Sequence, residues 1–230
     1  VEGRNPFRDR RVRLAMYHAI DMDAIVQRIM RGAARPAALL VAPGVNGYDE
    51  ALDRRFPYDP GVARQLLAEA GYPDGFEVRM DCPNDRYVND AEVCQAIAAM
   101  FAKVGIRARL DVQTKGIHFP KILSRNTSLF MLGWTPATYD AHNVLYNLVA
   151  TPDGSGQGQF NLGGYSNPRI DALVHAIASE ADEARRDELV REALRLHRED
   201  IGHLPLHQQG LAWGMRDTVR MVLRPDNFID

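Results

Sequence analysis

The chain has 230 residues, with 28 basic and 30 acidic side chains, a net charge of −2 and 46% hydrophobic residues. This composition is typical of a soluble globular protein. A charge so close to zero removes the main argument for a nucleic-acid or anionic-membrane partner, because binding to such partners needs a clustered basic excess. Every apolar run is much shorter than the roughly 20 residues that span a bilayer, so the sequence predicts no transmembrane segment.

Several segments carry apolar residues at helical spacing. The clearest starts at Asp59, a capping residue, and Pro60, which suits the first helical turn, and it ends at Gly71. The same reasoning predicts further helices over residues 9–20, 22–31, 90–104, 167–180 and 183–200.

Strand patterns lie between these helices. Residues 76–81 and 106–112 alternate apolar and polar side chains, which indicates half-buried strands. Residues 129–132 are a continuous apolar run, which favours a strand buried on both faces of a sheet. Because helices and strands alternate, the sequence predicts an α/β fold with helices on both faces of the sheet. Ligands of such folds bind in crevices at the sheet ends.

The rest of the chain predicts a long loop and a tail. Residues 151–165 contain five glycines and no periodicity, and a loop of that length is usually functional or mobile. No repeat or composition shift marks a second complete domain. We therefore expect one lobe over residues 1–210 and a short tail over residues 211–230.

Most enzymatic motifs fail on spacing. Gly154, Gly156 and Gly158 lack the spacing and the strand–helix context of a phosphate-binding loop. His203 and His207 have the spacing of a helical metal pair, but a proline between them breaks the helix. The sequence thus implies no resident metal and no cofactor.

One alternative enzyme stays open. Asp140 and His142 are the candidate ligands of a metal-assisted hydrolase, which needs a third carboxylate or histidine from elsewhere in the chain.

Polar and aromatic residues gather directly after the apolar run at 129–132. Aromatic walls with a few polar groups are typical of small-molecule sites. The alternative is that the tryptophan belongs to the core and the tyrosine to a surface loop. The candidate binding residues are Trp134, Thr135, Thr138, Tyr139, Asp140 and Asn143.

Six segments, in order, resemble the C-terminal lobe of the bacterial extracellular solute-binding proteins of family 5. This family includes the dipeptide, oligopeptide and nickel receptors of ABC importers. The matching segments are residues 5–13 with 19–21, 58–60, 66–76, 132–134, 164–168 with 171–173, and 204–206. Together they cover nearly the whole chain.

The resemblance implies a periplasmic-binding-protein-like lobe, with a mixed sheet covered by helices on both faces. It implies a non-enzymatic, monomeric receptor that traps a peptide-like or other small polar solute between two lobes and delivers it to an ABC permease. Such a receptor is periplasmic, or extracellular and tethered to the membrane. The first residues lack the apolar core of a secretory signal. We therefore expect a fragment without its signal peptide and first lobe, whose tail over residues 211–230 returns toward that lobe.

The resemblance also assigns site residues. In the peptide receptors an Asp three residues after the matching Trp pairs with the α-ammonium of the ligand, and here that position is Ala137. Asp140 either takes this role or caps a turn. Lys115 and Tyr48 match positions that line the cleft in relatives.

Two further possibilities stay open. His118 and His142 are the candidate ligands if the solute is a metal chelate. Cys82 and Cys94 are too few for a disulfide scaffold, and in an oxidising compartment they form either one bridge or two buried thiols.

Overall fold

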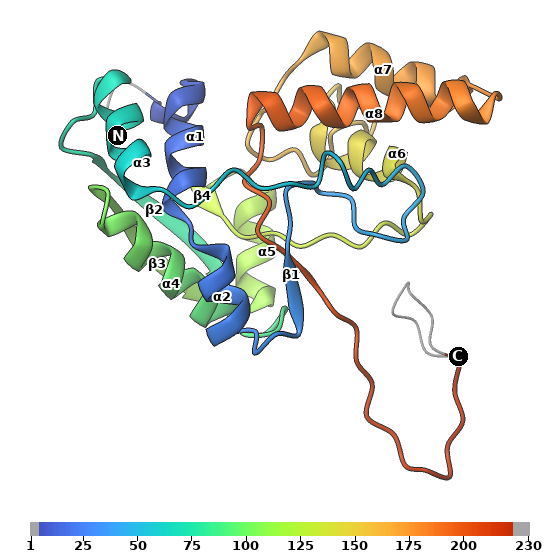
Figure 1. Ribbon diagram of the computed structural model, residues 1–230, viewed down its shortest axis with the longest axis horizontal. Helices are drawn as coiled ribbons and strands as arrows, with labels where there is room; N and C mark the ends of the chain where they lie inside the picture. The colour runs from blue at the N-terminus through green and yellow to red at the C-terminus, as the bar shows by residue number, and fades with distance from the viewer. Residues whose placement is uncertain (1–4, 223–230) are drawn as a thin grey trace.

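The computed structural model describes residues 5–222 of the chain. Helices and strands alternate through most of it (Figure 1). The elements are the 3-10 turn Pro6–Arg8, α1 (Arg10–Ala19), α2 (Met22–Arg28), β1 (Ala34–Pro36), α3 (Pro60–Glu69), β2 (Phe76–Pro83), α4 (Asp90–Ala102), β3 (Ile106–Gln113), α5 (Lys115–Leu123), β4 (Leu129–Phe130), α6 (Ala141–Val144) with a π-helical turn (Leu145–Val149), α7 (Pro168–Ser179), α8 (Glu183–Asp200) and β5 (His207–Gln209).

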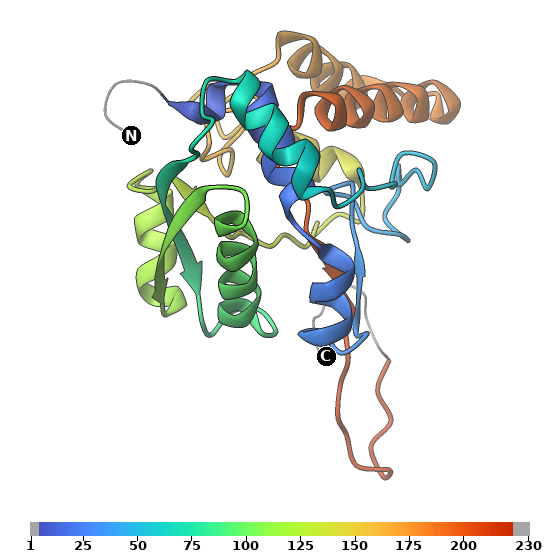
Figure 2. The ribbon, with the colours of Figure 1, turned by 60° about the vertical axis from the view of Figure 1, so that its left-hand side comes forward.

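A parallel sheet in the order β3-β2-β4 organises the first part of the structure. The apolar side chains of β2 face α4. On the opposite face of the sheet, Asp81 forms an ion pair with Lys121 of α5. Figure 2 shows these two helices on either side of the sheet. A separate antiparallel pair joins β1 to β5. The α/β fold with helices on both faces is therefore confirmed.

One strand differs from its prediction. The run at 129–132 forms a strand only at Leu129 and Phe130, which pair with β2 at the edge of the sheet. Both residues are half-buried. The expected full burial on two faces is wrong because no further strand lies beyond β4 among the described residues.

The predicted helices appear close to their expected ends, but α5 and α6 lie in segments without a predicted helix. The α5 segment contains Gly116 and Pro120, which weaken the helical pattern. Burial of His118 and Ile122 supplies tertiary packing that overrides this preference.

The buried apolar residues form two clusters. The first cluster is formed by the helices α1, α2, α3 and α4 together with the parallel sheet. The second is formed by residues 39–45 together with α6, α7 and α8. Figure 1 shows the helices and strands of the two clusters side by side, with α7 and α8 above the rest. Residues 211–222 extend away from both clusters. The lobe boundary near residue 210 stays a prediction.

The loop at 151–165 is a loop, as predicted, and a buried asparagine anchors it. The amide nitrogen of Asn161 donates to the carbonyl oxygens of Val149, Ala150 and Tyr165, at 3.2, 2.9 and 2.8 Å. Its amide oxygen accepts from the backbone of Tyr165 at 3.0 Å. These bonds tie the loop to the end of the π-helical turn.

Cys82 and Cys94 form a disulfide between the end of β2 and the first half of α4. Both side chains are fully buried. Of the two alternatives, one bridge or two buried thiols, the structure has the bridge. It closes the loop over residues 84–89.

Candidate functional site

A groove of about 2120 Å³ opens between the two clusters. One wall is formed by the 3-10 turn, β2 and the loop at 84–89. The other includes residues 37–45 and the loop at 160–166, while residues 127–136 and 200–209 run between the walls. The first half of β2 lines the groove, and so do residues 86–88 and 131–136, which follow β2 and β4. The latter two segments agree with the expectation of a site near the strand ends.

Trp134 lines this groove together with Thr135 and Tyr139. The indole nitrogen of Trp134 donates to Asn143 Oδ1 at 2.9 Å, and the indole ring lies 4.8 Å from the ring of Phe160. Asn143 does not itself line the groove; it holds Trp134 from behind. The structure thus brings Trp134, Thr135 and Tyr139 to one surface, with Asn143 as support.

Asp140 is turned away from the groove and serves the fold. Its carboxylate caps α6 by accepting from the backbone of His142 at 2.8 Å, and it accepts from Asn46 at 2.9 Å. Arg186 of α8 binds both carboxylate oxygens. Burial raises the pKa of Asp140, but the bonds from Arg186, His142 and Asn46 outweigh it and leave the pKa below its ordinary value. Of the two roles open in the sequence, the geometry fits the cap.

The neighbouring Ala137 and Thr138 are exposed and do not line the groove. Lys115 is also exposed and lies outside it, at the first position of α5, where its backbone donates to Asp85 Oδ1 at 2.6 Å.

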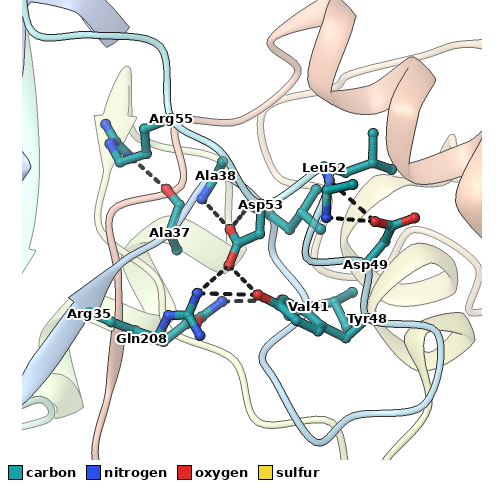
Figure 3. Close-up of polar contacts among 12 residues, drawn as sticks. Arg35, Ala37, Ala38, Val41, Tyr48, Asp49, Leu52, Asp53, Arg55 and Gln208 are labelled. Atoms are coloured by element: carbon teal, nitrogen blue, oxygen red, sulfur yellow. Dashed lines mark hydrogen bonds and ion pairs between the residues drawn. The ribbon is translucent and has the colours of Figure 1, made fainter.

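Tyr48 belongs to a polar network around Asp53 (Figure 3). Its hydroxyl donates to Asp53 Oδ2 at 3.0 Å, and Arg35 reaches the same oxygen at 3.2 Å. The other oxygen of Asp53 accepts from the backbone of Ala38 and Leu39 at 2.6 and 3.1 Å. Tyr48 also lines a smaller cavity of about 520 Å³ with Tyr139. Tyr48 does not line the main groove, although this smaller cavity shares Tyr139 with it.

Sequence reasoning missed the loop that follows β2. Arg86 and Tyr87 line the groove, and the guanidinium of Arg86 lies 5.0 Å from the centre of the Tyr87 ring. Arg86 is exposed. The rule that sites gather at strand ends points to this loop as much as to Trp134, but its residues form no recognisable motif.

Positive side chains outnumber negative ones along the groove. Among the described residues, five arginines and three carboxylates line it: Arg8, Arg13, Arg79, Arg86 and Arg109 against Glu77, Asp90 and Asp200. Arg109 pairs with Glu77 at 2.9 Å, and Arg13 donates to backbone carbonyl oxygens. Arg8 and Arg86 make no ion pair within the part of the chain that the structure describes.

Two groove histidines add no positive charge near neutral pH. Burial lowers the pKa of His203 to about 4 and also lowers the pKa of His207. His203 Nδ1 lies 2.8 Å from Nε2 of the buried His197. His203 is a loop residue and His207 lies in β5, so they share no helix, as Pro205 predicts.

The hydrolase alternative finds no support. Asp140 is held by Arg186, and His142 Nε2 lies 3.2 Å from the carbonyl oxygen of Val174. His118 is buried against Met131, with Nε2 3.0 Å from its carbonyl oxygen. Within residues 5–222, no group of three His, Cys, Asp or Glu side chains is arranged to hold a metal ion.

Residues 2–156 match the family described as bacterial extracellular solute-binding proteins, family 5 Middle. The chain belongs to this family. The glutathione-binding protein GsiB of Salmonella choleraesuis is 30% identical over 228 residues, which cover 93% of this chain and 44% of that protein. This family 5 chain therefore spans less than half the length of that relative. No helix among its described residues is long and apolar enough to cross a membrane.

Two solved structures share the fold of this family 5 chain. The periplasmic binding protein DppA of Helicobacter pylori, in complex with peptide STSA, aligns with a TM-score of 0.82 and 25% identity, over 89% of this chain and 39% of that one. AgaA of A. tumefaciens R10, in complex with agropinic acid, aligns with a TM-score of 0.80 and 25% identity, over 89% and 41%. The recognised family and the periplasmic-binding-protein fold are thus confirmed.

Proposed function

We propose that this chain is the C-terminal lobe of the substrate-binding receptor of an ABC importer. Its groove forms half of a site that closes on a small polar solute when a second lobe meets it. Binding then shifts the receptor toward the closed state, which the permease recognises. The receptor is monomeric, works outside the cytoplasm and performs no catalysis. Relatives more than twice as long as the chain support the two-lobed reading.

We further propose that the solute carries a carboxylate. The observation that carries this proposal is the position of Arg86, an exposed arginine without an ion pair, in the loop beside Trp134. A guanidinium forms strong, often bidentate hydrogen bonds to a carboxylate. GsiB is named for glutathione, and the structures of DppA and AgaA are complexes with peptide STSA and agropinic acid. All three ligands are acids.

The solute's ammonium group, if it has one, finds no unbound carboxylate at the matching position of this lobe. The three carboxylates that line the groove already have partners: Glu77 pairs with Arg109, Asp90 accepts from two backbone N–H groups, and Asp200 accepts from Tyr165 and Asn167. Ala137 replaces the aspartate of the peptide receptors, and Asp140 is already bound by Arg186 and Asn46. A buried ammonium without a carboxylate partner is strongly disfavoured. The proposed solute is therefore an acid whose recognition does not depend on a free amino terminus, such as a blocked peptide or an organic acid.

Calorimetry on a receptor that carries both lobes tests the carboxylate. Peptide STSA is compared with its C-terminal amide, which removes the negative charge and keeps the shape. We expect the amide to bind at least about tenfold more weakly, because a charge-assisted hydrogen bond is lost. In the Arg86→Gln variant the difference should shrink to about twofold. Equal binding of acid and amide to the unaltered receptor would refute the proposal.

Arg195→Gln serves as the matched control. Arg195 is a partly exposed arginine on α8 that pairs with Glu199 and does not line the groove. Its replacement should leave the preference for acid over amide unchanged. Acetylation of the peptide's amino terminus should cost less than about threefold in affinity, since neither Ala137 nor Asp140 is available to the ammonium. A loss above about tenfold would contradict this part of the proposal.

A further inference from the structure

The backbone around Trp134 is not held by the hydrogen bonds of a helix or a strand. Strand β4 ends at Phe130, and the last bond to the sheet is from the backbone of Met131 to the carbonyl oxygen of Asp81, at 3.0 Å. Trp134 therefore lies on a segment that leaves the sheet before it reaches the second cluster.

The hydroxyl of Tyr87 replaces the missing strand partner. It accepts from the backbone N–H of Gly133 at 2.7 Å and donates to the carbonyl oxygen of the same residue at 3.3 Å. Within the described residues, these are the only hydrogen bonds to the backbone between Leu132 and Thr135. One phenol thus satisfies both polar groups of the residue before Trp134.

The Tyr87 ring also explains why residue 133 is a glycine. A Cβ atom at residue 133 would lie 2.6 Å from Cε1 of Tyr87 and 3.0 Å from Cζ, closer than atoms can approach. Gly133 does not adopt a positive φ. Its lack of a side chain is therefore a matter of space for the Tyr87 ring and not of backbone conformation.

Tyr87 is itself firmly held. Asp90, a buried residue at the start of α4, accepts from the backbone N–H groups of Arg86 and Tyr87 at 3.0 Å each. The disulfide between Cys82 and Cys94 closes the same loop. The position of the Tyr87 hydroxyl is thus set by the first cluster, whereas the indole of Trp134 rests on Asn143 and Phe160 of the other wall.

We infer that Tyr87 is the positioning residue for Trp134, and that its hydroxyl fixes the indole at the junction of the two walls. Only the statement that Trp134 meets the solute rests on the proposed function. The link from Tyr87 to Gly133 and Trp134 is a property of the chain alone, so its test contains no solute.

The test follows the indole N–H of Trp134 by ¹⁵N NMR in the 230-residue chain. The chain has two tryptophans, Trp134 and Trp213, and Trp134→Phe identifies the signal. Tyr87→Phe keeps the ring and removes the hydroxyl. We expect the Trp134 signal to shift and its exchange with water to rise about three- to tenfold, because its bond to Asn143 opens more often. The Trp213 signal should not move.

Tyr58→Phe is the matched control, because Tyr58 is exposed and does not line the groove. It should change neither signal. An unchanged position and exchange rate for Trp134 in the Tyr87→Phe variant would overturn the inference.

A double-mutant cycle gives an independent readout. Gly133→Ala should disturb the Trp134 signal in the unaltered chain, because its Cβ displaces the Tyr87 ring. In a Tyr87→Ala background the same substitution should add little, since the clash is gone. Additive effects of the two substitutions would show that they act separately and would also overturn the inference.

Discussion

Arg186 binds the carboxylate of Asp140 through both of its terminal nitrogens, at 2.9 and 2.7 Å. This contact joins the N-terminus of α6 to α8, and Asn46 completes it from a third segment. Both side chains are about four-fifths buried, with exposures of 19% and 21%. Asp140 therefore stabilises the second cluster.

Replacement of Asp140 by Ala should lower the free energy of unfolding by about 2 kcal/mol, because it removes a helix cap and leaves Arg186 without its partner. The affinity for solute should stay within about twofold. Urea unfolding and calorimetry measure the two quantities. Asp140→Asn is the control that keeps a capping oxygen and should lose less. A variant with normal stability and weakened binding would return Asp140 to the site.

Reduction of the bridge between Cys82 and Cys94 should lower the free energy of unfolding by about 3 kcal/mol, since the disulfide restricts the unfolded chain. The urea midpoint with and without a reductant measures this loss. A Cys82→Ala/Cys94→Ala variant should be insensitive to the reductant. Two free thiols in denatured, non-reduced protein from an oxidising compartment would show that the bridge does not form.

Asp53, whose side chain is fully buried, should be a costly residue to replace. Its carboxylate accepts hydrogen bonds from the backbone N–H groups of Ala38 and Leu39, from the hydroxyl of Tyr48 and from the guanidinium of Arg35. Asp53→Ala should lower the free energy of unfolding by about 3 kcal/mol, because several donors lose their acceptor. Glu50→Ala, at an exposed position nearby, should cost under about 0.5 kcal/mol. Similar losses for the two variants would contradict the role of the network.

The stability of the chain should fall between about pH 6.5 and about pH 4, partly because of His203. Burial lowers the pKa of His203 to about 4, whereas an unfolded histidine titrates near 6.5. In this window the unfolded chain binds a proton that the folded chain does not, so the contribution is full above about pH 6.5 and lost as the pH falls.

His203→Gln should therefore reduce the slope of unfolding free energy against pH in this window, by up to about 1.4 kcal/mol per pH unit. Urea unfolding across the window measures the slope. His175→Gln, on the exposed side of α7, is the control and should leave the slope unaltered. A slope for His203→Gln equal to that of the unaltered chain would refute the assignment.

Local signals explain why most helices were predictable. The side chains of Asp59, Asn167 and Asp182 accept from the backbone N–H groups of the first turns of α3, α7 and α8. Each cap lies next to the helix that it starts, so a short stretch of sequence contains the whole signal. The helix α5 lacked such a signal, and its stability depends on burial of His118 and Ile122.

The site was less predictable because its parts come from distant segments. The polar and aromatic neighbours of Trp134 in the sequence make it a candidate, but Tyr87 reaches Gly133 across 46 positions in the chain. Arg186 also reaches Asp140 across 46 positions, which hid the structural role of that carboxylate. Both relationships depend on how strands and helices pack, and neither has a fixed spacing that a sequence pattern can reveal.

Asn161 has a consequence for the energetics of binding. Because its side chain satisfies backbone groups of Val149, Ala150 and Tyr165, the groove-lining loop at 160–166 is ordered before any solute arrives. The conformational entropy of that loop is lost during folding and is not subtracted from the free energy of association. In the proposed receptor this wall would be a preformed template, and a solute that fits it would bind without the cost of ordering the loop.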